Sequence, residues 1–478
     1  MSSDGDLVFS ADEPFGHQEY FSKIERAWQR APRGCSLNRR RVDRYDAGSS
    51  LLYSPVEYEH RSFVSDLKSD PPDELWAREA FLSFVRGEFG TGRPVREKPP
   101  RFSPTIRDEH TVGLEVFERF LEVSEAELVY SSVISSISQR YSDDMTAALF
   151  EVLCHPLIGN ARNRANVDFQ RFGHQVNSQV ERRDRLFLVL PSFPFKDQNR
   201  FRTSSNASTV DLGELALLVR LHVLGLALYQ VHPFGADIVV LSDGLLYSDI
   251  FGVDRGQALK YREQLRGFRN VLNIQGTVSI LDLSDLIGRL RDPATGDSTF
   301  DDTVRGLRLK IATFKSADPA LKDAYQTLKR GMKWNLNTRE SLRHRSDSEA
   351  WLILTEGDRR SIPPTLMSDW EAIEHRAEEA AEKYASTNIA LRYHQLLERT
   401  FPGAIRATVH PKPQQFATPS RGSAYPWNGV AWVSGGQLYT NAVETRPLYD
   451  LARHEAVDVF RFDLTGEPLF FTEPLDGR

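Results

Sequence analysis

The feature that most constrains the fold is a pair of short apolar segments separated by a longer apolar stretch. Residues 186–190 read Leu-Phe-Leu-Val-Leu, and residues 237–241 read Asp-Ile-Val-Val-Leu. Segments this short and this apolar are typical of central strands that are covered on both faces of a parallel sheet. The stretch between them, residues 211–230, predicts a buried helix. A strand, a helix and a second strand in this order favour an α/β fold.

Further along the chain, helical and strand patterns continue to alternate. A third strand is predicted at 405–409, and alternating segments near 429–433, 437–442 and 457–462 indicate a small antiparallel part. Helices are predicted at 73–86, 255–268, 281–290, 302–314, 318–331 and 368–386. The predicted fold class is therefore α/β, with a Rossmann-like, mostly parallel sheet, flanking helices and a small antiparallel C-terminal part.

The chain divides by composition near residue 113. Residues 1–113 are polar and contain Pro-Pro pairs at 71–72 and 99–100, which indicates an N-terminal extension or accessory layer. Residues 114–478 carry the patterns of a compact α/β domain. We expect the chemistry to lie in this second part.

Charge and apolar patterning narrow the class of protein. The net charge of −6 is spread along the chain, so no nucleic-acid partner is expected. Arg220 and His222 interrupt the most apolar stretch, which therefore fits a buried helix better than a membrane span. The two cysteines, Cys35 and Cys154, and an N-terminus without a signal-peptide pattern predict a cytoplasmic protein. The standard phosphate-loop, dinucleotide, zinc-protease and hydrolase motifs do not occur in the sequence.

Ligands of open α/β sheets bind outside the carboxyl ends of the strands, which directs attention to three loops. The first loop begins at Pro191 and contains Lys196, Arg200 and Arg202, which are suited to hold a phosphate or carboxylate. A solvated basic loop is the alternative. The second loop carries Asp243 and Asp249, which are suited to bind an amine or to act as a general base.

For the second loop, spacing alone favours a tight turn at Asp243-Gly244, with Asp249 capping the next element. The third segment places Arg406, Thr408 and His410 at alternate positions of a strand, so their side chains share one face. Lys412 lies just beyond. Polar groups in this position need hydrogen-bond partners, and a ligand or a neighbouring backbone group can supply them.

These loops carry four sequence elements in a fixed order. Residues 193–199 with Arg202 are similar to the pattern F-P-F-K-S-P-N followed by a basic residue, and 242–254 contain S-D-G, D and G-V-D. Residues 401–411 are similar to F-P-x-x-I-R-x-S-I-H-P, and 426–429 to P-W-H-G. In these elements the chain resembles the pyoverdine/dityrosine biosynthesis family, over roughly residues 120 to 475.

The resemblance implies an isocyanide synthase that uses no metal, nucleotide or other cofactor. In such an enzyme the α-amine of an amino acid condenses with the ketone of ribulose 5-phosphate, and proton transfers, loss of phosphate and carbon–carbon cleavage leave an isocyanide or a formamide. The chemistry requires an anion clamp and acid/base groups. The implied catalytic residues are His410, Asp243, Asp249 and Lys196. The implied substrate-binding residues are Asn199, Arg202, Ser242, Arg406, Thr408, Lys412 and Trp427.

Three departures from the family pattern support an alternative. Asp197-Gln198 replaces Ser-Pro, Arg202 stands where Lys is usual, and Asn428 replaces a His. They fit a different amino acid, an altered reaction or a catalytically retired member that binds a phosphorylated ligand or a partner protein. A nucleotide-dependent oxidoreductase, the third possibility, would need a glycine fingerprint that the chain lacks.

Overall fold

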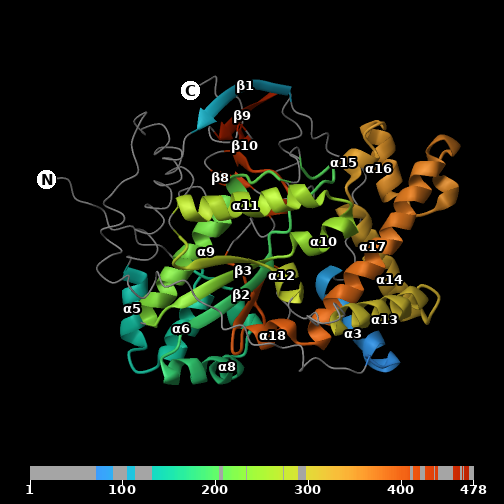
Figure 1. Cartoon of the computed structure of the whole chain (residues 1–478). Helices are drawn as coiled ribbons and strands as arrows, with labels where there is room; N and C mark the ends of the chain where they lie inside the picture. The colour runs from blue at the N-terminus through green and yellow to red at the C-terminus, as the bar shows by residue number, and fades with distance from the viewer. Residues whose placement is uncertain are drawn as a thin grey trace.

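The computed structural model describes most of the chain after residue 70. The described residues are 71–89, 105–112, 132–203, 208–232, 234–272, 274–288, 298–409, 413–419, 426–434, 437–439, 456–462, 466 and 468–472. In these residues the chain forms two five-stranded sheets, and helices lie around one of them, the main sheet (Figure 1).

The main sheet is parallel throughout, with the strand order β4-β3-β2-β5-β6. Its strands are β2 (Leu186–Ser192), β3 (Ala236–Ser242), β4 (Val278–Asp282), β5 (Ile405–Thr408) and β6 (Phe416–Ala417). The three strands predicted from sequence are β2, β3 and β5, and they lie side by side in this one sheet. All seven residues of β3 are buried, as the unbroken apolar pattern indicates.

The predicted buried helix is α9 (Leu212–Val231). Asp211 and Glu214 form a capping box at its start, and the polar opening of the apolar stretch is therefore the helix N-terminus. The helix is long and apolar enough to cross a membrane, but 94% of its apolar window is buried inside the protein. It is a core helix that packs on β3 and β4.

Two local predictions were wrong. The helix expected at 281–290 is the end of strand β4 followed by the short helix α12 (Leu283–Gly288). Burial alternates along β4 as in a strand, whereas Leu283, Leu286 and Ile287 have helical spacing and dominated the pattern. Asp243-Gly244 is likewise not a turn between strands, because it starts helix α10 (Gly244–Phe251) directly after β3.

The second sheet has the order β1-β9-β10-β7-β8 and is mixed, not wholly antiparallel. The pairs β7–β8 and β9–β10 are antiparallel, whereas β1–β9 and β7–β10 are parallel. Its strands are β1 (Thr105–Val112), β7 (Trp432–Ser434), β8 (Gln437–Tyr439), β9 (Ala456–Phe462) and β10 (Pro468–Thr472). Strand β1 precedes the predicted boundary at 113 and yet pairs with a strand near the C-terminus.

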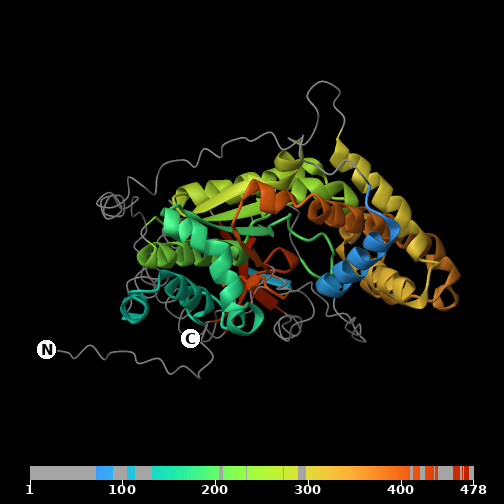
Figure 2. The ribbon, with the colours of Figure 1, turned by 90° about the horizontal axis from the view of Figure 1, so that it is seen from below.

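A layer of helices extends beyond one end of the main sheet, as Figure 2 shows. It contains α13 (Thr299–Phe314), α14 (Pro319–Asn335), α16 (Asp347–Thr355) and α17 (Met367–Tyr393). Helix α3 (Glu74–Phe89) packs on α13, α14 and α17, although it comes from the polar N-terminal part.

The remaining helices complete the layers on and around the sheets. They are α5 (Ser132–Arg140), α6 (Met145–Cys154), α7 (Asn163–Asn166), α8 (Phe169–Arg182), α11 (Arg255–Val271), α15 (Thr338–Ser341), α18 (Leu396–Thr400), and the short 3-10 helices η3 (Arg359–Ser361), η4 (Pro364–Leu366) and η5 (Pro426–Asn428).

Candidate active site

A cavity of about 230 Å³ opens at the carboxyl ends of the parallel strands. Ser192 at the end of β2, Asp243 after β3 and Thr408 at the end of β5 all line it. The cavity therefore lies where ligands of open α/β sheets bind. The ends of the three strands predicted from the sequence therefore border one cavity, and ligand binding there stays a prediction.

The loops after β2 and β3 are locked together beside this cavity. Phe193 has a left-handed backbone with φ of 57°, which is strained for a bulky residue, and its carbonyl accepts a hydrogen bond from the Ser242 hydroxyl at 2.9 Å. Gly244 is required here, because a Cβ at this position would lie 1.7 Å from the Pro194 carbonyl oxygen. This close approach fixes Asp243 relative to the first loop.

Asp243 has the environment of an acid/base group. It is the N-cap residue of α10, but its side chain makes no capping hydrogen bond. Its Oδ1 atom is buried and has no hydrogen-bond partner among the described residues. Burial raises the pKa of Asp243 to about 7, and the nearby carboxylates of Asp282 and Glu88 contribute to the rise. A carboxyl group that titrates near neutral pH can both take and return a proton.

Two guanidinium groups lie on the same cavity wall. Arg406 and Thr408 point to one face of β5, as their alternation predicts, and both line the cavity. Nη1 of Arg406 lies 3.4 Å from Oε1 of Glu398, while its Nε is buried without a hydrogen-bond partner among the described residues. Arg392, in the last turn of α17, also lines the cavity. Burial lowers the pKa of Arg392, and the nearby charge of Arg406 adds to the effect.

Two neighbouring cations in a partly buried position are suited to bind an anion such as a phosphate or a carboxylate. The sequence indicated Arg406 but not Arg392. The short motif around β5 singled out Arg406, whereas Arg392 is one of many charged residues on a 27-residue helix. No local signal in the sequence distinguishes Arg392 from a charged residue on a solvated helix face.

Aromatic rings form much of the remaining wall. Tyr247, Tyr384 and Phe251 pack against one another, with ring centroids 4.9 Å apart for the two tyrosines and 5.8 Å apart for Phe251 and Tyr384. Burial raises the pKa of both tyrosine hydroxyls well above their ordinary value, so both stay protonated. Trp427 closes another part of the wall and packs on Phe193 at 5.2 Å. The cavity thus combines apolar surface with a few charged groups.

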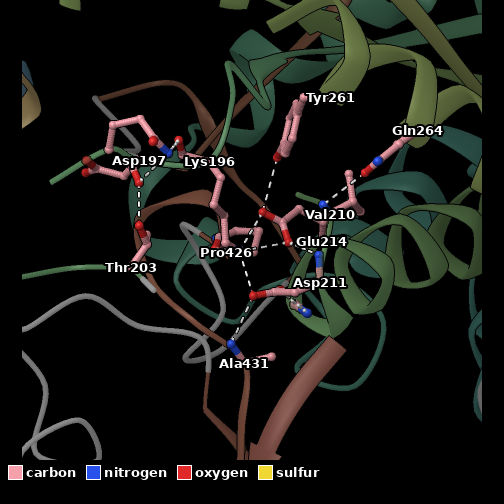
Figure 3. Close-up of polar contacts among 12 residues, drawn as sticks. Lys196, Asp197, Thr203, Val210, Asp211, Glu214, Tyr261, Gln264, Pro426 and Ala431 are labelled. Carbon is pink, nitrogen blue, oxygen red and sulfur yellow. Dashed lines mark hydrogen bonds and ion pairs between the residues drawn. The ribbon is translucent and has the colours of Figure 1, made fainter. Parts of the chain in front are cut away.

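Lys196 lies away from the cavity wall, in a fully buried ion cluster (Figure 3). Its Nζ atom donates to Oδ2 of Asp211 at 2.7 Å, to Oε1 of Glu214 at 2.9 Å and to the Pro426 carbonyl at 2.9 Å. Burial lowers the pKa of Lys196, but the two carboxylates outweigh burial and hold it above its ordinary value. These contacts join the first loop to α9 and η5, and they occupy the Lys196 ammonium group with partners from within the protein.

The other residues of the first loop also bind within the protein. Asn199 is buried, and its Nδ2 donates to the Trp334 carbonyl at 2.8 Å. Arg202 donates through Nη1 to Oδ2 of Asp197 and to Oδ1 of Asn335, each at 2.7 Å. Asp197 and Asn335 line the cavity, so Arg202 supports the wall from behind.

The structure therefore brings together part of the predicted site. Asp243, Arg406, Thr408 and Trp427 line the cavity, whereas Lys196, Asn199, Arg202 and Ser242 lie behind its wall. Asp249 is exposed on α10 and does not line it. His410 and Lys412 lie outside the described residues, and their roles stay predictions. Two departures from the family pattern, Asp197 and Asn428, are on the wall, as are Glu88 and Arg392, which the sequence did not indicate.

Comparison with known proteins points to one family. A model of the pyoverdine/dityrosine biosynthesis proteins matches residues 176–445. The chain is 35% identical over 113 residues to the isocyanide synthase xanB of Aspergillus fumigatus, a match that covers 22% of this chain and 15% of that protein. It is 22% identical over 279 residues to the L-tyrosine isonitrile synthase of Xenorhabdus nematophila, covering 55% of this chain and 73% of that protein.

Among solved structures, the PvcA protein from Pseudomonas aeruginosa is similar at 20% identity with a TM-score of 0.44. The similarity covers 69% of this chain and 100% of the PvcA chain.

Proposed function

Because the chain belongs to the pyoverdine/dityrosine biosynthesis family, we propose that it is an isocyanide synthase that acts on the α-amine of an amino acid. The similar proteins named isocyanide or isonitrile synthases support this class of reaction. We further propose ribulose 5-phosphate as the one-carbon source, with an isocyanide or a formamide as product. No metal or nucleotide takes part in this proposal.

The observation that carries the proposal is that Asp243 and the two guanidiniums of Arg392 and Arg406 line one cavity. The reaction needs a group that moves protons between the amine and the sugar carbons, and a carboxyl with a pKa of about 7 is suited to this. It also needs a site for anions, since both substrates carry one. Arg392 and Arg406 supply that positive charge.

In this proposal each side chain on the cavity wall has a separate role. Asp243 takes a proton from the substrate ammonium, which leaves the nitrogen lone pair free to attack the sugar ketone. Arg406, on β5, binds the phosphate group. The apolar wall formed by Tyr247, Phe251 and Tyr384 excludes water from the reacting carbons. His410 follows Thr408 by two residues and remains a second candidate for proton transfer.

The test is to incubate the purified chain with ribulose 5-phosphate and each standard amino acid in turn, with and without a metal chelator, and to analyse the products by mass spectrometry. Consumption of the sugar phosphate and formation of an isocyanide or formamide from one amino acid is the expected result. If neither substrate is consumed with any amino acid, the catalytically retired alternative is favoured. Activity that is present without the chelator and lost when the chelator is added would contradict the proposed metal independence.

A further inference from the structure

Glu88 reaches the cavity from a part of the chain that precedes the family region. The other described residues on the wall lie between 191 and 428, inside the matched range 176–445. Glu88 lies in the last turn of α3 and has a side-chain exposure of 21%. The N-terminal helix therefore adds a carboxylate to a wall that the family region otherwise supplies.

The position of Glu88 is fixed by the way α3 docks. Phe81 and Phe84 are fully buried, and their rings lie 5.1 Å from Phe314 and 5.8 Å from Tyr384, respectively. At the start of the helix, the side chain of Arg78 forms an ion pair with Asp318. Figures 1 and 2 both show α3 lying against α13, α14 and α17. Since contacts hold α3 along its length, its last turn is placed at the cavity by the fold.

A cation faces Glu88 at this position. Nη2 of Arg392 lies 3.7 Å from Oε1 of Glu88, which is an ion pair without a hydrogen bond between these two atoms. The guanidinium also lies over the ring of Phe84, with Cζ 5.4 Å from the ring centroid. Helix α3 therefore orients Arg392 through two side chains. Both charged groups line the same cavity, so a ligand can contact them together.

A carboxylate beside a guanidinium complements an α-amino acid, whose ammonium and carboxylate groups are attached to one carbon. The C-terminal end of a helix carries partial negative charge, which adds to the attraction of Glu88 for a cation. We propose that Glu88 and Arg392 bind the head group of the amino-acid substrate, with Glu88 accepting hydrogen bonds from the ammonium and Arg392 donating to the carboxylate. This assignment rests on the proposed function for the class of substrate.

The position of Asp243 fits the proposed binding of the substrate ammonium by Glu88. Glu88 and Asp243 line the same cavity, and the charge of Glu88 contributes to the raised pKa of Asp243. An ammonium held by Glu88 therefore lies in the same cavity as the group that deprotonates it. The N–H bond breaks, the proton passes to the Asp243 carboxylate, and the electron pair stays on nitrogen for attack on the ketone. Arg406 is left to bind the phosphate of the second substrate.

The test compares Glu88→Gln with Glu79→Gln, a matched change at an exposed position of the same helix. Binding of the standard amino acids to the full chain is measured by calorimetry, and inorganic phosphate serves as a probe of the Arg406 side. Glu88→Gln should weaken binding of the preferred amino acid by roughly 10–100-fold, because it removes a charge-assisted hydrogen bond. In Glu88→Gln, phosphate affinity and melting temperature should stay near wild type. The control Glu79→Gln should leave amino-acid affinity, phosphate affinity and melting temperature unchanged.

The outcomes separate this inference from the proposed function. Loss of amino-acid binding in Glu88→Gln, with no isocyanide formed even by wild type, would support the head-group site and refute the reaction. Unchanged amino-acid affinity in Glu88→Gln, or a wild-type chain that binds no standard amino acid, would refute the head-group site. If the Gln variant does not fold, Glu88→Asp retains the charge but withdraws it by one methylene. It should then show a smaller loss in the same direction.

Discussion

Replacing Asp243 with Asn tests the acid/base assignment through two independent quantities, turnover and stability. The Asn side chain keeps the size of the carboxyl group but cannot take a proton. General acid/base groups contribute roughly 10²–10⁴-fold to rate, so kcat of Asp243→Asn should fall by about that factor. In the wild type, kcat/KM should rise with pH through about 7, since the ionised form of Asp243 is the base.

The stability effect follows from the pKa of the same group. The folded-state pKa of Asp243 is raised from 3.8 to about 7, so its protonated form is favoured in the folded protein. Its contribution to stability is therefore present below pH 4 and is lost as the pH rises through about 7. One pKa unit corresponds to about 1.4 kcal/mol, and the full shift corresponds to about 4 kcal/mol. Asp243 is only half-buried, so solvent screening reduces this contribution, and we expect about 1–3 kcal/mol between pH 5 and pH 8.

Urea unfolding of wild type and Asp243→Asn at pH 5, 6.5 and 8 measures this difference. The variant should gain stability relative to wild type as the pH rises, because it has no buried carboxylate to ionise. Asp285→Asn, an exposed acid on α12, is the control and should show no such dependence. A stability difference that does not vary with pH would refute the raised pKa. Normal turnover in Asp243→Asn with loss in Asp249→Asn would move the base to Asp249.

Three further changes test the remaining assignments. Arg406→Ala should raise KM for ribulose 5-phosphate roughly 10-fold or more, with little change in melting temperature, and Arg406→Lys should restore the low KM only in part. The same KM in Arg406→Ala and wild type would exclude a phosphate contact. Lys196→Met should lower the free energy of unfolding by about 3–5 kcal/mol, because it leaves two buried carboxylates without their cation. A variant as stable as wild type in urea would contradict a stabilising role of the buried ion cluster. His410→Gln should lower turnover by roughly 10²–10⁴-fold while ribulose 5-phosphate still binds, as judged by steady-state kinetics and calorimetry; a folded variant with normal turnover would exclude His410 as the catalyst.

The parts of the fold that were predicted correctly are those whose signal is local. Strands β2 and β3 are continuous apolar runs that fit a doubly covered sheet, and Asp243 follows from its place after such a strand. Lys196, a catalytic residue in the implied site, lies behind the cavity wall in the structure. Its partners Asp211 and Glu214 are 15 and 18 residues away, and no local pattern shows that they meet it.

Glu88 and Arg392 were missed for a related reason. Each is a charged residue on a helix, and a charged helix residue is usually solvated. Only the packing of α3 against α17 turns the two side chains toward the same cavity. Tertiary contacts of this kind have no signature in the sequence around either residue.

The pairing of β1 with β9 has a consequence for synthesis of the protein. The guanidinium of Arg461 donates to Glu109, 352 residues earlier in the chain, so the second sheet forms only after its last strands leave the ribosome. At about 5–20 residues per second, β1 waits roughly 20–70 s without its partner. An unpaired strand is open to association with other chains, but β1 carries Arg107, Asp108 and Glu109 in succession. Charges at a strand edge oppose such association, so β1 can remain soluble until β9 emerges.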